Sequence, residues 1–218
     1  SKMLVAPHTM LDTILAKIER EGDHAHAGRP ARIVAKMNSL QDSKVIRALY
    51  EASQKGVEIT LIVRGICCLR PGIEGVSDNI RVISIIGRYL EHSRIFYFEN
   101  DSQSEVFIGS ADWMPRNLRR RVEILCPIED PKLIERIRNE ILNICLADNV
   151  KARELLPDGS HQRIVVPAGT PKISCQDALM NLANGEKIEI PNFFAPPSVK
   201  PKKRQTKPKK TTTANAAD

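Results

Sequence analysis

The stretch EHSRIFYFE, from Glu91 to Glu99, decides how this sequence folds. A short polar start leads into a run of aromatic and β-branched residues, which is the composition of a buried β-strand. Side chains on a strand alternate between its two faces, so His92 and Arg94 point to the same side. An imidazole and a guanidinium therefore project together from the beginning of a central strand.

Further apolar runs of strand length lie before and after this segment. Apolar residues at helical spacing predict helices over about residues 8–26, around Val45–Tyr50 up to Gly56, and over residues 131–147. Several of the strand-like runs are apolar almost throughout, as in strands that are covered on both faces. Strands that alternate with helices indicate an α/β layer structure. The expected strands are Ala31–Met37, Val57–Val63, Ile80–Ile85, Arg94–Phe98, Glu105–Ile108 and Val122–Leu125.

The C-terminal part of the chain has a different composition. Residues 166–190 are expected to form a small extension with a helix at Cys175–Asn184, after a short strand at Arg163–Val166. From Pro191 onward Pro, Lys and Thr dominate, which predicts a disordered basic tail over residues 191–218. Seven cations and one acid give this tail six of the seven net positive charges. Because the body is nearly neutral, a nucleic-acid partner is not expected.

The cysteine pattern and the hydropathy indicate the cellular location of the protein. An odd number of cysteines without C-x-x-C spacing favours reduced thiols in a cytoplasmic protein over a disulfide framework or a zinc site. No apolar run reaches the ~20 residues that cross a bilayer, and the N-terminus has no secretory signal. We therefore expect a cytoplasmic location and leave peripheral association with a membrane open. The cysteines are Cys67, Cys68, Cys126, Cys145 and Cys175.

Histidine-based phosphate chemistry needs an imidazole, fixed cations and groups that orient the ring. His92 and Arg94 supply the first two requirements. Glu99 follows on the same strand, and a Gly-Ser-Ala-Asp segment follows the next strand. Glu99, Ser110 and Asp112 are therefore our candidates for orienting His92.

The pattern H-x-R-x4-E followed by G-S-x-D resembles the H-x-K-x4-D and G-S-x-N signature of the phospholipase D superfamily. It departs from that signature in having Arg94 for Lys, Glu99 for Asp and Asp112 for Asn. Five segments, in this order, look like the C-terminal domain of bacterial polyphosphate kinase, and the resemblance covers about residues 3–163. They are Lys36-Met37-Asn38-Ser39-Leu40, Leu61-Ile62-Val63-Arg64-Gly65, Ser77-Asp78-Asn79-Ile80-Arg81, Arg88-Tyr89-Leu90-Glu91-His92 and Ser110-Ala111-Asp112-Trp113-Met114.

The resemblance implies a phospholipase D-like domain over residues 1–165, with a mixed sheet flanked by helices. This domain would be one half of the two-domain arrangement that is usual in the superfamily. Enzymes of the family transfer the terminal phosphate of ATP reversibly to polyphosphate, with Mg²⁺ and through a phosphohistidine in a K-I-H-x-K motif. This chain lacks that motif, so the phosphohistidine is expected in the missing N-terminal portion. The intact enzyme is expected to be a homo-oligomer with ATP, ADP and polyphosphate as its ligands, and this chain alone is expected to be inactive.

The family's functional residues can be carried over to matching positions. His92 matches the second histidine of the family, which contacts ATP or polyphosphate and is proposed to act as general acid or base. Arg64 ends a predicted strand and matches a nucleotide-binding arginine, in keeping with bidentate phosphate contact. Arg94 and Arg121 are further phosphate-binding candidates. The Mg²⁺ ligands are expected outside this chain, and no metal ligand is predicted within it.

Two alternatives stay open on the sequence alone. One is a stand-alone phospholipase D-like phosphodiesterase or nuclease, active as a dimer in which each copy contributes one His-x-Arg. The other is a non-catalytic module that binds a polyanion. Hydrolysis of bis-p-nitrophenyl phosphate that depends on His92 would favour the first alternative.

Overall fold

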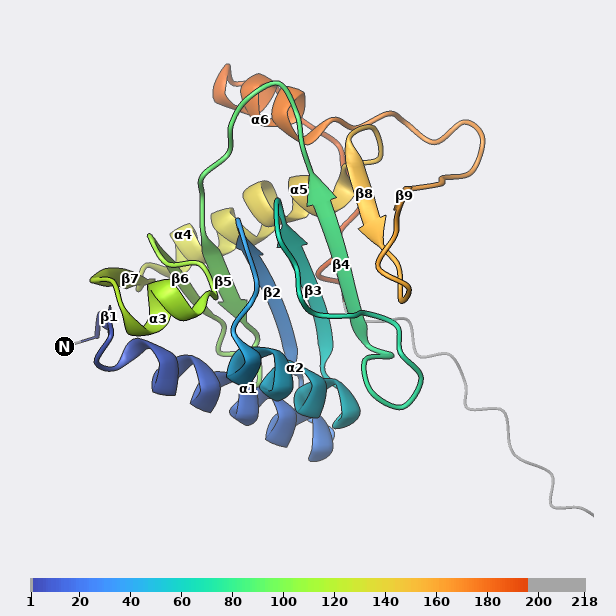
Figure 1. The fold of residues 1–218 in the computed structure, drawn as a ribbon. Helices are drawn as coiled ribbons and strands as arrows, with labels where there is room; N and C mark the ends of the chain where they lie inside the picture. The colour runs from blue at the N-terminus through green and yellow to red at the C-terminus, as the bar shows by residue number, and fades with distance from the viewer. Residues whose placement is uncertain (1, 196–218) are drawn as a thin grey trace, which may run out of the picture.

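A mixed sheet of nine strands forms the centre of residues 2–195, the part of the chain that the computed structural model describes (Figure 1). The strands lie in the order β1-β7-β6-β5-β2-β3-β4-β8-β9. Strands β2, β3 and β4 are parallel, and the other neighbouring pairs are antiparallel. The bounds are β1 Leu4–Ala6, β2 Arg32–Met37, β3 Glu58–Val63, β4 Ile80–Ile85, β5 Ile95–Phe98, β6 Glu105–Gly109, β7 Glu123–Ile128, β8 Ala152–Leu155 and β9 His161–Arg163.

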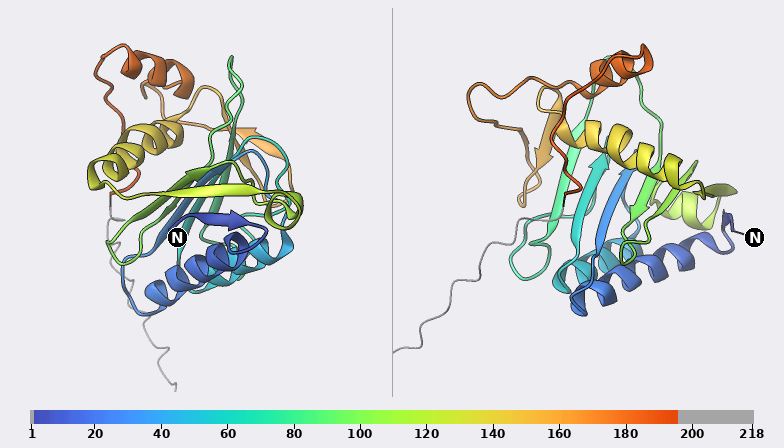
Figure 2. Two further views of the ribbon diagram at one scale, coloured as in Figure 1. Left: turned by 90° about the vertical axis from the view of Figure 1, so that its left-hand side faces the viewer. Right: turned by 180° about the vertical axis from the view of Figure 1, so that it is seen from behind.

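Helices cover both faces of the sheet, as Figure 2 shows from the side and from behind. Helices α1 and α2 lie on one face. On the other face lies a single rod made of α4, the π-helical turn η1 and α5, with α6 beside it. Among residues 2–195, no helix is long and apolar enough to span a membrane. The bounds are α1 Met10–His26, α2 Ser43–Gln54, α3 Pro115–Arg119, α4 Pro131–Arg136, η1 Ile137–Leu142, α5 Asn143–Ala147 and α6 Cys175–Ala183.

Local signals explain where helix α2 begins and ends. The side chain of Asp42 caps its N-terminus by accepting hydrogen bonds from the backbone N–H groups of Lys44 and Val45, at 3.1 and 3.2 Å. Gly56 follows the last turn with a φ of 101°, a conformation that side chains other than hydrogen disfavour. The helix therefore ends next to the glycine that the sequence indicates as its C-terminal limit.

Strand β5 is buried on both of its faces. Phe96 and Phe98 belong to the core beneath α1 and α2, whereas Ile95 and Tyr97 belong to the core beneath α5 and α6. The ring of Phe96 stacks on Trp113 with centroids 5.0 Å apart. This double burial fixes the register of β5 in the sheet, and with it the position of the polar residues that precede the strand.

The expected fold class, an α/β domain with a mixed sheet flanked by helices, is confirmed, as are the predicted helices and the main strands. The sequence analysis missed β1, α3 and β8. Strand β1 has three residues and β8 reads Ala-Arg-Glu-Leu, so neither shows the alternation that identifies a strand. The strand expected at Arg163–Val166 lies at His161–Arg163 instead, because its pairing with β8 ends there.

The C-terminal segment packs on the domain over more residues than the sequence predicts. The predicted helix is present as α6, and order does not end at Pro191. The backbone N–H of Phe193 donates to Asn143 at 2.8 Å, and the guanidinium of Arg32 lies 5.7 Å from the ring centroid of Phe194. The prediction of disorder is thus wrong for residues 191–195, because the backbone of Phe193 and the ring of Phe194 make contacts that the composition did not suggest. The basic part of the tail lies outside the described residues.

An ion-pair cluster joins helix α1 to strand β6. The carboxylate of Glu105 accepts from Lys17 at 2.8 Å and from Arg20 at 2.7 Å. Burial, the largest single influence, opposes ionisation, but the hydrogen bonds and charges of the two cations together lower the pKa of Glu105 below its ordinary 4.5. A lowered carboxyl pKa gives stability that is complete above the ordinary value and is lost as the pH falls through the lowered one.

We therefore expect Glu105→Gln to lower the free energy of unfolding at pH 7 by about 1 kcal/mol. The difference from the wild type should shrink as the pH falls below about 4.5. Urea unfolding at several pH values measures both effects. Glu140→Gln is the control, because Glu140 belongs to an exposed pair with Arg136 within one helix, and it should change the stability little. An equal loss in both variants would contradict the prediction.

Candidate functional site

Five segments of the sheet bring polar residues together at one edge. Strands β2 and β3 end at this edge, β5 begins there, β6 ends there, and β7 begins there. The loops and the short helix α3 that follow these strand ends enclose a cavity of about 510 Å³. Its lining is almost entirely polar: Asn38, Ser39, Arg64, His92, Arg94, Ser110, Asp112, Arg116, Asn117, Arg121 and Glu123.

The cavity lining carries more positive than negative charge. Four arginines and His92 face two carboxylates, those of Asp112 and Glu123. Both carboxylates are buried and engaged in hydrogen bonds. The remaining excess of guanidinium groups suits an anion with several oxygens, such as a phosphate chain.

Asp112, Arg94 and His92 form a chain of contacts at the cavity wall. The two carboxylate oxygens of Asp112 accept from Nε and Nη2 of Arg94 at 3.1 and 3.2 Å. The third guanidinium nitrogen, Nη1, donates to the backbone oxygen of His92 at 2.8 Å and contacts the ring nitrogen Nδ1. A guanidinium can only donate, so Nδ1 is an acceptor here, and the neutral imidazole carries its proton on Nε2. Arg94 therefore favours the neutral tautomer that can donate a hydrogen bond from Nε2.

A second network surrounds Glu123, which the sequence analysis did not single out. Its carboxylate accepts from the amide of Asn117 at 2.6 Å and from the hydroxyl of Ser110. Ser110 was predicted to orient His92, but in the structure its hydroxyl bonds to Glu123. An acid at the start of an otherwise apolar strand was the signal that could have identified Glu123, because a buried carboxylate needs partners.

Glu99 does not lie in the cavity, so the prediction that it orients His92 is wrong. Strand β5 separates the two residues and, at 3.3 Å per residue, places them roughly 20 Å apart. The carboxylate of Glu99 accepts instead from the hydroxyl of Tyr97 at 2.7 Å. Burial and the neighbouring carboxylate raise the pKa of Tyr97 to about 12, so this hydroxyl stays a donor.

The other predicted residues lie around the cavity. Arg64 lines it and donates from Nη1 to the backbone oxygen of Glu91 at 2.8 Å. Arg121 lies at its exposed rim, and Arg116 of helix α3, which the sequence analysis missed, is also exposed. Lys36 is buried and pairs with Glu91 at 2.5 Å.

Two buried polar atoms in the cavity wall lack a protein partner among the described residues. They are the amide nitrogen Nδ2 of Asn38 and the amide oxygen Oδ1 of Asn117. Buried polar groups usually have partners. A donor and an acceptor without one, in a cavity lined by guanidinium groups, are consistent with a site that binds a hydrated polyanion.

The residues present do not form a metal cage. Within residues 2–195, no three His, Cys, Asp or Glu side chains cluster in a way that could hold a metal ion. The two carboxylates of the cavity already accept hydrogen bonds from Arg94, Ser110 and Asn117. We therefore assign no Mg²⁺ ligand among residues 2–195 and derive no step through the ion.

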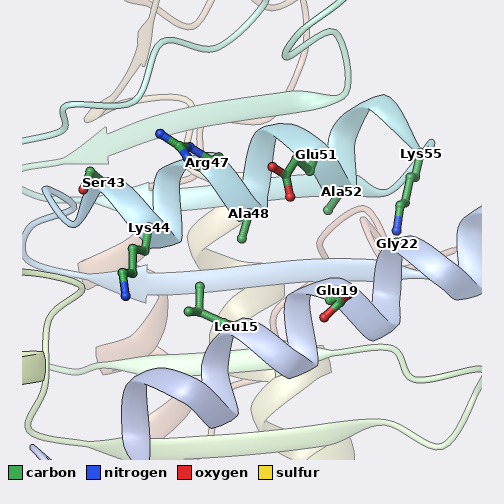
Figure 3. Close-up of a pocket in the computed structure, with 10 residues that line it drawn as sticks. All are labelled: Leu15, Glu19, Gly22, Ser43, Lys44, Arg47, Ala48, Glu51, Ala52 and Lys55. Atoms are coloured by element: carbon green, nitrogen blue, oxygen red, sulfur yellow. The ribbon is translucent and has the colours of Figure 1, made fainter.

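A groove of similar size lies between helices α1 and α2, away from the cavity (Figure 3). Its charges are mixed, with Lys44, Arg47 and Lys55 facing Glu19 and Glu51, and it contains no histidine. This composition does not favour one class of ligand, so we place the functional site at the sheet edge.

A mixed α/β domain that gathers four arginines and a histidine at one end of its strands has a cavity suited to phosphate groups. Residues 3–176 match the family model described as "Polyphosphate kinase C-terminal domain 2". The chain belongs to the polyphosphate kinase family.

Individual relatives agree with the family match. The chain is 63% identical over 160 residues to a polyphosphate kinase of Synechocystis, covering 73% of this chain and 22% of the relative. It is 56% identical over 163 residues to a polyphosphate kinase of Pseudomonas aeruginosa, covering 75% and 24%. The crystal structure of polyphosphate kinase from Porphyromonas gingivalis matches with a TM-score of 0.80 at 44% identity, over 85% of this chain and 28% of that one. The chain thus spans about a quarter of the length of these relatives.

The ion pair between Asp112 and Arg94 should stabilise the domain because both side chains are buried, at 5% and 10% exposure. We expect Asp112→Asn to lower the free energy of unfolding by about 3 kcal/mol, since it leaves a buried guanidinium without its counter-ion. The matched control is Asp101→Asn, which breaks an exposed pair with Arg29 and should cost less than about 1 kcal/mol. Urea denaturation compares the two, and equal losses would refute the assignment.

Proposed function

We propose that this chain is the part of a polyphosphate kinase that binds the terminal phosphates of ATP and polyphosphate beside His92, during reversible phosphate transfer. The observation that carries the proposal is the contact of the Arg94 guanidinium with Nδ1 of His92 at the cavity wall. Nδ1 accepts from Arg94, which leaves a proton on Nε2 next to a cavity lined by guanidinium groups. Family membership supports the reaction, and the geometry supports the role of this histidine in it.

In the proposed mechanism, this chain supplies charge neutralisation and a hydrogen-bond donor. Arg64, Arg116 and Arg121 contact the non-bridging oxygens of the phosphate chain and offset their negative charge. When the bridging oxygen between the last two phosphates leaves, it gains negative charge, and the N–H group at Nε2 of His92 stabilises that charge by donating a hydrogen bond, with the proton staying on the ring. In the reverse direction the same N–H group donates to the attacking oxygen. Mg²⁺ bound with the phosphate chain would add charge neutralisation, through protein ligands outside this chain.

The phosphorylated histidine lies outside this chain in our proposal. The other four histidines, His8, His24, His26 and His161, are not among the residues that line the cavity. In our proposal the rest of the enzyme therefore completes the site, and the intact enzyme is a homo-oligomer. It works in the cytoplasm, where the five free thiols stay reduced. Family membership favours this function over a phosphodiesterase or a module without turnover.

Tripolyphosphate binding tests the ligand class. We expect the chain to bind inorganic tripolyphosphate with an affinity that falls as salt is added, because the contacts are between charges. Arg64→Ala should weaken binding about tenfold, since it removes a charge-assisted hydrogen bond. Arg47→Ala, in the groove between α1 and α2, is the control and should leave the affinity unchanged. Equal affinities of both variants in isothermal titration calorimetry would contradict the proposed site.

Labelling with γ-³²P-ATP and Mg²⁺ tests the role of His92. Because its Nδ1 is held by Arg94 and its Nε2 is protonated, we expect no acid-labile phosphohistidine on this chain. The matched control is His92→Ala, which should give the same background count. Label that appears on the wild type and disappears in the variant would identify His92 as the phosphate carrier and would overturn the assignment.

A further inference from the structure

We propose that Gln176, at the start of helix α6, is a positioning residue that sets the place of His92 and Arg64 in the cavity. It does not touch the cavity itself and acts through Glu91. The inference rests on the proposed function for its effect on ligand binding, but its effect on His92 can be measured without a ligand.

The side chain of Gln176 is buried and binds the connection between β4 and β5. Its amide oxygen accepts from the backbone N–H of Tyr89 at 2.9 Å, and its Nε2 donates to the backbone oxygen of Tyr89 at 2.8 Å. Nε2 also donates to the carboxylate of Glu91 at 3.1 Å. The side chain of Gln176 thus supplies the backbone hydrogen bonds that a neighbouring strand would otherwise provide. It fixes the connection at Tyr89 and Glu91.

Gly87 allows this close approach. A Cβ atom built on Gly87 would lie 2.3 Å from Oε1 and 2.6 Å from Cδ of Gln176. No side chain larger than hydrogen fits there without moving Gln176 or the connection. The two residues are 89 positions apart in the sequence, yet each constrains the other.

Glu91 transmits the position to the cavity. One of its carboxylate oxygens accepts from Gln176, and the other pairs with the buried Lys36 at 2.5 Å. Its backbone oxygen accepts from Arg64 at 2.8 Å, and the next residue is His92. Displacement of Glu91 therefore moves both the guanidinium and the imidazole that face the ligand.

Hydrophobic packing does not hold this connection in place. Three of its large apolar side chains are exposed: Ile86 by 68%, Tyr89 by 46% and Leu90 by 79%. Helix α6, in contrast, is anchored. Cys175 is buried against Cys145 of α5, and its backbone N–H donates to the buried Asp148 at 2.7 Å. In Figure 1 the connection between β4 and β5 rises to meet this helix. The fixed helix thus holds the exposed connection through Gln176.

The test replaces the amide while keeping its volume. We expect Gln176→Met to weaken binding of inorganic tripolyphosphate to the chain about tenfold, because the misplaced groups lose optimal contact. It should also shift the ¹H–¹⁵N NMR signals of the His92 ring. Asn181→Ala is the control, because it removes an exposed amide from the same helix, and it should change neither readout. Gly87→Ala should reproduce the effects of Gln176→Met by displacing the glutamine.

The double variant gives a stricter criterion. In a Gln176→Ala background the clash with a new Cβ at position 87 is gone, so Gly87→Ala should add less than about twofold to the loss of affinity. All binding is measured well below the melting temperature, so that a loss of stability alone leaves the affinity unchanged.

The outcomes separate the two proposals. A wild-type chain that binds no tripolyphosphate overturns the proposed function, and the His92 signals then decide the inference. Unchanged His92 signals in both Gln176→Met and Gly87→Ala overturn the positioning role, as does wild-type affinity in both variants.

Discussion

The carboxylate of Asp112 joins three strand ends in one place. It accepts from the backbone N–H of Asn38 after β2, at 2.7 Å, and from two nitrogens of Arg94 before β5, while it follows β6 itself. Removing a carboxylate and a guanidinium from water costs several kcal/mol for each ion unless each finds good partners. The site can therefore keep these charges buried only when the strands are in register. In turn, the register is fixed by the double burial of β5.

The arginines of the cavity differ in how many of their nitrogens are already bonded to the protein. Arg94 uses three nitrogens on Asp112 and His92 and orients the ring. Arg64 commits one nitrogen to the backbone beside His92 and keeps the rest of its guanidinium at the cavity. Arg116 and Arg121 stand exposed at the rim. The cavity thus has exposed guanidinium groups at its rim and hydrogen-bonded ones deeper inside.

The sequence predicted the parts of this arrangement that have a local cause. Strand β5, helix α2 and the pairing of His92 with Arg94 on one face all follow from patterns within ten residues. Asp112 was identified through its segment, although its partner Arg94 could not be deduced from spacing alone. Glu99 was wrongly expected beside His92 because the two residues are close in the sequence motif. In the structure they lie at opposite ends of strand β5. The roles of Glu123 and Gln176 depend on contacts between segments far apart in the chain, and only the folded sheet brings these segments together.

The position of Gln176 shows how the two cores of the domain cooperate. The cavity lies at the beginning of β5, whose Phe96 stacks on Trp113 under α1 and α2, yet the segment that carries His92 is bound to α6, on the opposite face. Packing on one face fixes the start of β5, and hydrogen bonds from the other face fix the residues just before it. Neither core alone would hold the imidazole, because the exposed connection between β4 and β5 lacks buried side chains of its own. The hydrogen bonds of Gln176 therefore supply, from the opposite face, the support that the connection does not obtain from packing.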